Sequence, residues 1–403
     1  MSSKLSDTFY LNRAGGYSAA PNSNAKLPVV YGDLTDGISG LWELPCLNST
    51  DWVYAFAGHE VLSIANGNSI VIYEDGLVLT GGGTDYTFNA KNDYEGNGYI
   101  ATIDMVNPKL NAIITATGMG KPTATGGATL MENIIDIVYD FLTVENDFVS
   151  GDFEATYKAK ASQIFTAQGY AAAGVINRDR EIWDIIIEMM ASFLGSAYLD
   201  GDGDLVLALD DNTVSQYGQA DIFRKSEITL KSAKQRLVNI INQCPCNYAY
   251  NYAQGYFRSE TDASAHADAA SQGIYGVKKP STPYQFYWCR DLTDVQTVQD
   301  IIVSKFKAPL YEVEIEEITP KHIGVDQGDT FIASIDSLYD KDGLQLLNNY
   351  WRCVGVRSDY TNLKISFRAL QANHFLTAAY IADGAYKADG SIKAGNNRDT
   401  TSY

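Results

Sequence analysis

Three aspartates at alternate positions are the residues best spaced to bind a cation. Asp200, Asp202 and Asp204 copy the spacing of the first three ligands of an EF-hand calcium loop. The sixth loop position is Leu205 where that loop has glycine, and the twelfth is Asp211 where it has glutamate. A strand-like run follows, where an EF-hand has a helix. The sequence therefore favours a tight acidic hairpin turn and leaves the three aspartates as a weak calcium-site candidate.

No enzyme motif in the sequence is complete. It contains no Gly-x-Ser-x-Gly nucleophile elbow, no phosphate-binding Walker loop and no His-Glu-x-x-His zinc motif. The glycines at 81–83 and at Gly118-Met-Gly120 do not complete a dinucleotide-binding loop and indicate turns. The four histidines have no metal-ligand spacing with another His or Cys, and the five cysteines are typical of thiols in a reducing compartment. We therefore expect no catalytic residue and no cofactor.

Composition and charge narrow the class of protein further. The 403 residues include 30 Lys and Arg against 49 Asp and Glu, a net charge of −19. Such a surface repels a phosphate backbone, so we expect no broad nucleic-acid binding. Apolar residues make up 45% of the chain, which excludes a disordered protein. The first 20 residues lack a signal-peptide core and no apolar run has membrane-spanning length, so we expect a protein made in the cytoplasm without stable membrane insertion.

Short strands separated by turns follow a polar N-terminal arm, residues 1–26. Residues 27–120 form a predicted β domain of six or more strands. Its clearest element is a hairpin of Ser69–Tyr73 and Leu77–Thr80 around an Asp75-Gly76 turn. The other strands expected here are Leu27–Tyr31, Trp52–Phe56, Tyr99–Met105 and Asn111–Thr117.

Apolar residues change to helical spacing in residues 121–225, the predicted helical insert. Thr129 and Glu132 have the spacing of a capping box ahead of a helix that starts near Ile134. Two more helices are expected, over Glu154–Gln168 and Arg180–Leu194, each followed by a glycine that can end it. The hairpin around the three aspartates closes this insert.

Strand-like runs return in residues 226–375, the second predicted β domain. The strands expected here are Ile228–Lys231, Arg236–Gln243, Tyr248–Tyr256, Tyr311–Glu317, Thr330–Ile335, Tyr350–Val356 and Leu363–Leu370. One helix interrupts them, starting near Thr293 and ending before Pro309. Residues 376–403 contain an Ala-Asp-Gly unit twice and are too polar to form a core. We therefore predict an extended arm that becomes ordered on contact with a neighbouring protein. The chain is therefore predicted to be α+β and β-dominated, with two β-barrel or sandwich domains, a helical insert and extended terminal arms.

Several short segments follow one another in a distinctive order through the second β domain. They are Asn239–Asn242, Tyr248–Tyr252, Asp268, Ser271, Tyr275-Gly276, Lys278, Val298–Phe306, Ala308-Pro309, Tyr311–Glu317, Ile323–Phe331, Trp351–Val356 and Leu363–Ala369. Within them, Gly328-Asp329 has the residues of a tight turn that leads into a strand. In this order the chain resembles the central hub, or tail-tip, proteins of tailed bacteriophages and phage-like particles. Leu27–Asp33 and the helical insert also look like parts of such hubs, so the resemblance covers most of the chain.

The resemblance implies a structural virion protein at the distal end of a tail tube. In that family the protein is a homotrimer with two tube-like β domains in each subunit, so that three subunits continue a sixfold tube. The implied partners are the distal tail protein, the tape measure protein and a tail fibre or spike protein, with transient passage of DNA that is not specifically bound. The implied location is the virion tail tip. Long fibre modules are absent before Tyr403, so we expect receptor binding on another chain.

Tyrosines and the terminal arms are the predicted interface residues. The sequence has 27 tyrosines, which suit protein interfaces and equally favour strands. Besides residues 1–26, the residues for which we predict interface roles are Tyr248, Tyr250, Tyr252, Tyr256, Asp383, Tyr386 and Asp389.

Two alternatives to the hub stay open. A tail-associated polysaccharide- or peptidoglycan-degrading enzyme would need a carboxylate pair, and the many acidic residues single none out. A sugar-binding receptor protein would need exposed aromatic rings. Trp42, Trp52, Trp288 and Trp351 are available for that, or else belong to the core or to a subunit interface.

Overall fold

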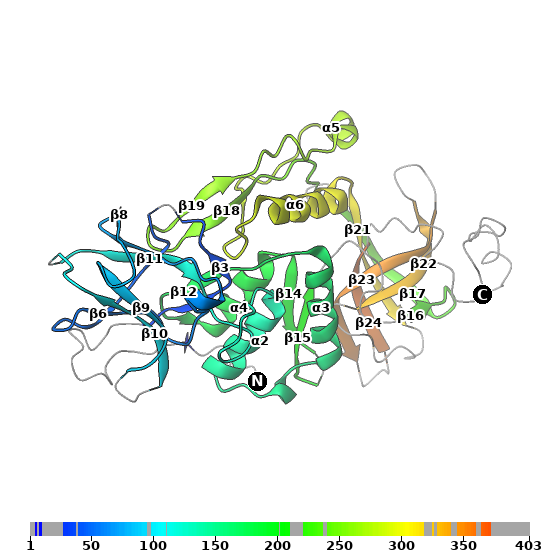
Figure 1. Cartoon of the computed structure of the whole chain (residues 1–403). Helices are drawn as coiled ribbons and strands as arrows, with labels where there is room; N and C mark the ends of the chain where they lie inside the picture. Colours follow the sequence, from blue (N-terminus) through cyan, green and yellow to red (C-terminus); the bar gives the residue numbers. More distant parts are fainter. Residues whose placement is uncertain are drawn as a thin grey trace, which may run out of the picture. The chain divides into compact units, whose positions relative to one another are not determined.

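Strands dominate the part of the chain that the structure describes. The computed structural model describes residues 5, 8–9, 27–37, 39–94, 98–109, 111–200, 202–209, 221–236, 240–317, 325, 329–339, 345–359 and 364–371. These residues form 24 strands and five α-helices, which confirms the prediction of a β-dominated chain (Figure 1). No helix among them is both long and apolar enough to span a bilayer. The predicted interface residues Asp383, Tyr386 and Asp389 lie outside the described residues.

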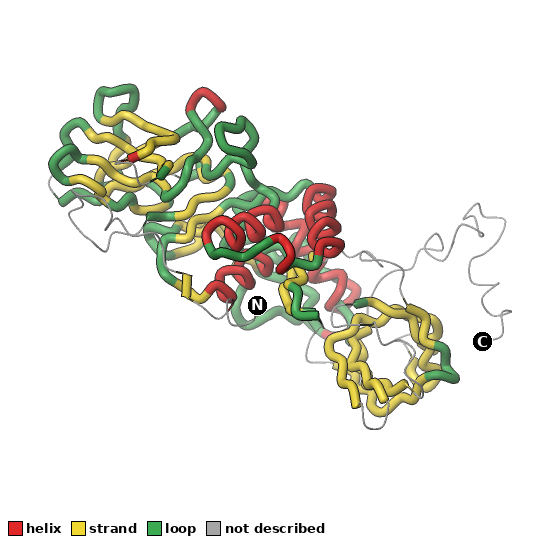
Figure 2. Tube along the Cα trace, turned by 90° about the horizontal axis from the view of Figure 1, so that it is seen from below, coloured by secondary structure: helices red, strands yellow, loops and turns green. Residues whose placement is uncertain are grey.

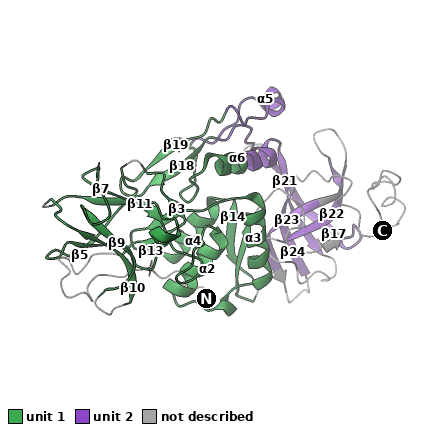
Figure 3. Ribbon diagram, viewed as in Figure 1, with its two compact units in different colours: residues 1–209, 245–263, 282–299 green, residues 210–244, 264–281, 300–403 purple. Residues whose placement is uncertain are grey.

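The chain divides into two compact units (Figure 3). Unit 1 contains residues 1–209, 245–263 and 282–299, and unit 2 contains residues 210–244, 264–281 and 300–403. Unit 1 thus includes the residues of both the first predicted β domain and most of the predicted helical insert. The five-part division of the sequence stays a prediction.

The first core of unit 1 lies among nine strands. They are β3 (Asp33–Leu34), β4 (Trp42–Glu43), β5 (Cys46–Asn48), β6 (Val53–Ala57), β7 (Val71–Glu74), β8 (Leu77–Val78), β9 (Tyr86–Asp93), β10 (Tyr99–Met105) and β11 (Ile114–Met119). One sheet has the order β5-β6-β10-β9, and the other has the order β3-β11-β7-β8, with β4 also paired to β11. Residues of both sheets share one hydrophobic core, in which the rings of Trp42 and Phe56 meet edge-on at 5.0 Å. On β10, Ile103 faces this core and Ile100 joins a second, smaller cluster, so the strand is buried on both faces.

Local turn chemistry places the β7–β8 hairpin where the sequence predicts it. Asp75 and Gly76 both have positive φ angles, 50° and 81°, as a two-residue Asp-Gly turn requires. Tyr73 and Val78 lie opposite each other across the pair. The hairpin prediction is therefore confirmed.

The other described elements of the first 209 residues are three helices, three short strand pairs and two 3-10 turns. The elements are α2 (Ile134–Glu145), α3 (Ala155–Gln168), α4 (Ile182–Ala191), the strand pairs β1 (Thr8–Phe9) with β13 (Arg180–Glu181), β2 (Val29–Tyr31) with β12 (Gly174–Ile176) and β14 (Gly195–Leu199) with β15 (Leu205–Leu209), and the 3-10 turns η2 (Ile64–Asn66) and η4 (Ser150–Asp152). The prediction of a helix over Glu154–Gln168 is confirmed: the Glu154 side chain accepts a hydrogen bond from Tyr157 N, and Gly169 ends the helix with a φ of 74°.

Two details of the helix predictions are wrong. The N-cap of α2 is Asn133, whose Oδ1 accepts a hydrogen bond from Ile135 N at 3.0 Å, so Thr129 and Glu132 do not form the predicted capping box. Helix α4 is shorter than the predicted Arg180–Leu194. It begins only at Ile182, because Arg180 and Glu181 form strand β13, and it ends at Ala191.

The tyrosine-rich segment Tyr248–Tyr256, predicted as one strand, is a hairpin. It consists of β18 (Cys246–Asn251) and β19 (Tyr256–Glu260), and β20 (Tyr284–Gln285) pairs in parallel with β18. The prediction is wrong because Gly255 has a φ of 73° and the Asn251 side chain accepts a hydrogen bond from Gln254 N at 3.0 Å, so the chain reverses.

Unit 2 contains one six-stranded sheet. Its strands are β16 (Asp221–Phe223), β17 (Ile228–Arg236), β21 (Leu310–Glu317), β22 (Thr330–Tyr339), β23 (Gln345–Asp359) and β24 (Lys364–Gln371), in the order β16-β22-β23-β24-β21-β17. Figure 2 shows the sheet curling into a half-barrel. The break predicted between Lys231 and Arg236 is wrong, since β17 runs through both. Helix α5 (Ala269–Tyr275) belongs to this unit, and α6 (Leu292–Phe306) contains a boundary between the two units and ends before Pro309 as predicted.

The connection between β16 and β17 explains why this sheet curls. The two strands form opposite edges of the sheet, yet only four residues, 224–227, join them. The edges of a flat six-stranded sheet lie about 24 Å apart. Five extended residue steps cover about 18 Å at most. The sheet must therefore bend until its edges approach, and the rings of Phe223, Phe331 and Phe367 pack together in the core that results.

Three of the four candidate tryptophans are core residues. Trp42, Trp288 and Trp351 are at most 1% exposed, which contradicts their use as sugar-stacking surfaces. Trp52 is half-buried and packs against the first core.

A buried group of charged side chains joins β2 to α2. Lys121 Nζ lies 2.7 Å from Asp140 Oδ2, and that oxygen also accepts a hydrogen bond from the Tyr31 hydroxyl at 2.7 Å. Glu145 lies 3.9 Å from the same ammonium. Burial raises the pKa of Tyr31 and of Glu145, and it lowers the pKa of His59 to about 4, so that this imidazole is neutral at pH 7. Lys121 is thus the cation that compensates two buried carboxylates.

Replacing Lys121 with methionine tests this role. The variant leaves the partly buried Asp140 and Glu145 without their cation, so we expect the free energy of unfolding to fall by about 2 kcal/mol in urea titrations. Lys109→Met is the control: Lys109 is 58% exposed beside Glu74, which keeps its hydrogen bond from Lys109 N. The control should cost less than about 1 kcal/mol, and equal losses in both variants would contradict the assignment.

Candidate functional site

Asp200, Asp202 and Asp204 lie at the turn of the β14–β15 hairpin. Asp200 Oδ1 accepts hydrogen bonds from Asp202 N at 3.0 Å and from Asp204 N at 2.8 Å, so this carboxylate holds the turn itself. Within the described ranges, no group of three His, Cys, Asp or Glu side chains is close enough to hold a metal ion. The geometry is that of the acidic hairpin turn, which the sequence favours over a calcium loop.

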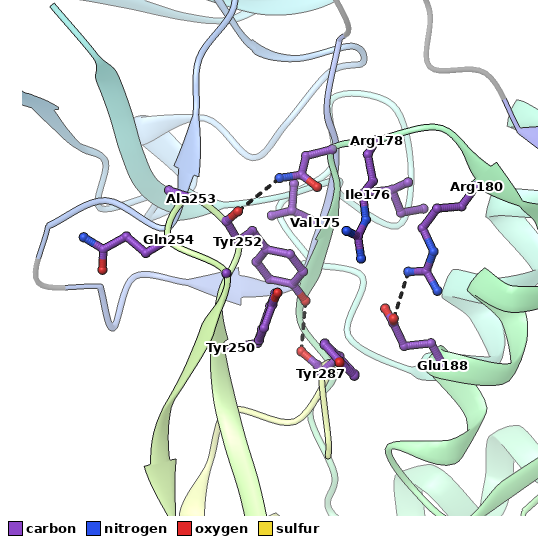
Figure 4. A pocket seen from close by; sticks show the side chains of 12 residues that line it. Val175, Ile176, Arg178, Arg180, Glu188, Tyr250, Tyr252, Ala253, Gln254 and Tyr287 are labelled. Atoms are coloured by element: carbon purple, nitrogen blue, oxygen red, sulfur yellow. Dashed lines mark hydrogen bonds and ion pairs between the residues drawn. The ribbon is translucent and has the colours of Figure 1, made fainter.

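The strongest candidate for a binding site is a pocket of about 310 Å³ in unit 1, between β12, α4 and the β18–β19 hairpin (Figure 4). The lining residues that carry its chemistry are Asn177, Arg178, Arg180, Glu188, Tyr250, Tyr252, Gln254 and Tyr287. Two of the tyrosines predicted to lie at an interface, Tyr250 and Tyr252, therefore meet here. Tyr248 is half-buried and Tyr256 is 51% exposed, and neither lines the pocket.

A glycine on β12 allows the hairpin to approach. A Cβ atom on Gly174 would lie 2.6 Å from the ring of Trp288 and 2.7 Å from the Tyr252 hydroxyl. Real Cβ atoms do not approach other heavy atoms so closely, so any larger residue would push the tyrosine or the indole away. Gly174 thus sets the distance between β12 and the aromatic wall of the pocket, the cluster of rings that includes Tyr250, Tyr252 and Tyr287.

Hydrogen bonds fix the turn that carries Tyr252. Ala253 N donates to the Leu41 carbonyl at 2.8 Å, and Asn251 Nδ2 donates to the Gly40 carbonyl at 3.3 Å. Across the pocket, Asn177 Nδ2 donates to the Tyr252 carbonyl at 3.3 Å (Figure 4). The wall is therefore held from both sides.

The aromatic wall is a packed cluster of phenol rings. The ring of Tyr250 lies 5.1 Å from that of Tyr252, 4.8 Å from that of Tyr287 and 4.9 Å from that of Phe257, all in edge-to-face contact. The Tyr252 hydroxyl donates to the Tyr287 carbonyl at 2.9 Å, and the Tyr287 hydroxyl donates to Gln285 Oε1 at 3.0 Å. Burial, and then the charge of Glu188, raises the pKa of Tyr252 and of Tyr287, so both phenols stay neutral at pH 7.

Two arginines and one glutamate lie beside this wall. Arg180 Nη1 is 2.8 Å from Glu188 Oε2, and the other oxygen of Glu188 accepts a hydrogen bond from Trp288 Nε1 at 3.3 Å. Arg178 is exposed and has no ion-pair partner in the described part of the chain. The pocket therefore offers phenol rings, amides and one unneutralised guanidinium.

A second pocket in unit 1, of about 250 Å³, is acidic. Its charged lining residues are Asp33, Asp36, Glu132, Arg290 and Asp291. Asp36 is bound by Arg290, at 2.6 Å, and by Arg258, at 3.2 Å. Burial, and then the charge of Asp33, raises the pKa of Glu132. Burial also raises the pKa of Asp294 to about 6, although its carboxylate accepts a hydrogen bond from Ala171 N at 3.0 Å.

Sequence reasoning missed most residues of both pockets. Arg178, Glu188 and Tyr287 are far apart along the chain, and folding brings them together. Besides the tyrosines, the signal available was Arg178-Asp179-Arg180, two basic residues close together in an acidic chain. No protein-family model matches the sequence, and a search of curated proteins finds no significant match.

Adding a methyl group at Gly174 tests the packing of the pocket. We expect Gly174→Ala to lower the free energy of unfolding by about 2 kcal/mol, because the new Cβ overlaps Trp288 and Tyr252. The emission maximum of tryptophan fluorescence should also shift, because the new Cβ displaces the Trp288 ring. Gly151→Ala is the control, since nothing lies within 4 Å of its Cβ position. A Gly174 variant as stable as this control would show that the approach is not tight.

The raised pKa of Asp294 predicts a pH-dependent effect on stability. The folded chain binds this proton more tightly than the unfolded chain, whose value is 3.8, so the group destabilises the fold as pH rises from about 4 to 6. At pH 7 the ionised carboxyl therefore lowers the stability of the folded chain. The Asp294→Asn variant keeps a side-chain oxygen that accepts the hydrogen bond from Ala171 N, but it carries no charge. Its melting temperature should exceed that of the wild type at pH 7.5 and equal it at pH 4. The same difference in melting temperature at both pH values would contradict the prediction.

Proposed function

We propose that the chain is a structural hub protein at the distal end of a phage tail tube. As a homotrimer it would join the sixfold tube and the distal tail protein to a threefold fibre or spike protein. It would also form the channel for the tape measure protein and the ejected DNA. The proposal rests on the resemblance in the order of sequence segments. It assigns the protein to the virion tail tip after synthesis in the host cytoplasm.

The observation that best supports the proposal is that one chain contains two separate β cores. One core lies among the strands of unit 1, and the other lies in the half-barrel of unit 2. A trimer needs two β bodies in each subunit to match a partner with sixfold symmetry. The net charge of −19 suits a channel through which DNA passes without binding.

One specific observation favours an alternative, a polysaccharide- or peptidoglycan-degrading enzyme. Such an enzyme needs a carboxyl group that stays protonated to act as an acid, and Glu132 combines a pocket with a raised pKa. Release of reducing ends from bacterial polysaccharide, lost in Glu132→Gln, would replace the hub proposal with this one.

The mass of the purified chain in solution tests the hub. We expect three times the 44.1 kDa of one chain, measured by light scattering at micromolar concentration. Deleting residues 381–403 should preserve that mass and weaken attachment of the next tail component. A monomer would overturn the trimer, and complete infectious tails built with the truncated chain would overturn the role of the arm.

A further inference from the structure

The pocket beside Tyr252 has the chemistry of a ligand site that the hub proposal does not use. At about 310 Å³ it falls at the small end of the range of about 300–1,000 Å³ in which proteins hold small molecules. That volume suits one substituted six-membered ring. The inference that follows depends on this pocket and is independent of the tail-tip role.

Among the arginines and phenols that line the pocket, two groups have no partner in the described part of the chain. One is the exposed guanidinium of Arg178, and the other is the hydroxyl of Tyr250. The hydroxyls of Tyr252 and Tyr287 donate to other protein atoms, and Arg180 is neutralised by Glu188. The free groups therefore offer a strong anion contact and one hydroxyl hydrogen bond.

The pocket is positively charged, whereas the chain as a whole is strongly negative. Arg178 and Arg180 against Glu188 leave one positive charge in a protein that carries −19. Figure 4 shows both arginines on the side of Tyr252 opposite Gln254, so cationic and amide groups flank the phenol ring. A planar guanidinium binds a carboxylate through two parallel hydrogen bonds, which a neutral ligand cannot supply.

Phenol rings beside two side-chain amides match a saccharide. The apolar face of a sugar ring packs on aromatic rings, and its hydroxyl groups require donors and acceptors around the edge. Asn177 Oδ1 supplies an acceptor and Gln254 Nε2 a donor next to the tyrosine wall, since the other amide atom of each side chain is already hydrogen-bonded within the protein. A pocket for an apolar peptide side chain would have fewer polar groups at its edge.

We propose that this pocket binds a carboxylate-bearing sugar ring of the hexuronic acid type, with Arg178 on the carboxylate, Tyr250 on a ring hydroxyl and the phenol cluster against the ring. The ligand class is thus a unit of an anionic polysaccharide.

Calorimetric titration of the full chain with methyl glucuronide tests the proposal, with methyl glucoside as the neutral probe. We expect binding of the glucuronide that is at least tenfold tighter than that of the glucoside and that weakens with salt. Arg178→Gln should reduce glucuronide affinity about tenfold and leave the weak glucoside binding unchanged. Tyr250→Phe keeps the packed ring and should reduce affinity severalfold.

Lys160→Gln is the matched control. It removes one positive charge from α3, outside the pocket, and glucuronide affinity should stay at the wild-type value. Equal affinity for the two sugars, no glucuronide binding at millimolar concentration, or an Arg178→Gln variant with full affinity would each overturn the proposal. Tighter binding of a Tyr-Asp dipeptide than of the glucuronide would replace the sugar with an acidic peptide.

Discussion

A buried tryptophan holds three segments of unit 1 together, and the pocket depends on it. The Trp288 carbonyl accepts a hydrogen bond from Ala173 N at 3.0 Å, next to β12, and its indole lies against Gly174. Its backbone N donates to Ser192 Oγ just after α4, and its Nε1 donates to Glu188 within that helix. The ring is 1% exposed, so these bonds are shielded from water. These contacts therefore fix the distances between β12, α4 and the tyrosine wall.

Several cations of this acidic chain neutralise carboxylates that are partly withdrawn from water. Lys121 lies between Asp140 and Glu145, and Arg290 is only 7% exposed where it binds Asp36. Burial raises the pKa of Asp294, which has no such cation within the described residues, to about 6. Arg178 differs from these cations because it is exposed at the edge of an aromatic pocket and has no ion-pair partner in the described part of the chain, and that is why it carries the ligand assignment.

Features encoded locally could be predicted from the sequence, and features made by distant residues could not. The Asp75-Gly76 turn and the ends of α3 follow from residues within one turn of the backbone. The single strand predicted over Tyr248–Tyr256 failed because alternating tyrosines hid a turn fixed by Asn251 and Gly255. The pocket joins residues 175–188 to residues 250–287, and no local pattern records that contact. Trp288 shows the same limit, since its type fits a core, a subunit interface or a sugar site.

The two β cores constrain any ring that the chain could form. Unit 2 builds its core inside one curled six-stranded sheet, which the short β16–β17 connection forces to bend. Unit 1 builds its core from two separate sheets of a different strand order. In the proposed trimer, three copies would therefore contribute two unlike kinds of β body, and a sixfold partner would meet both kinds. Sixfold symmetry in such a ring can only be approximate, so each neighbour must tolerate two different contact surfaces or bind one of them.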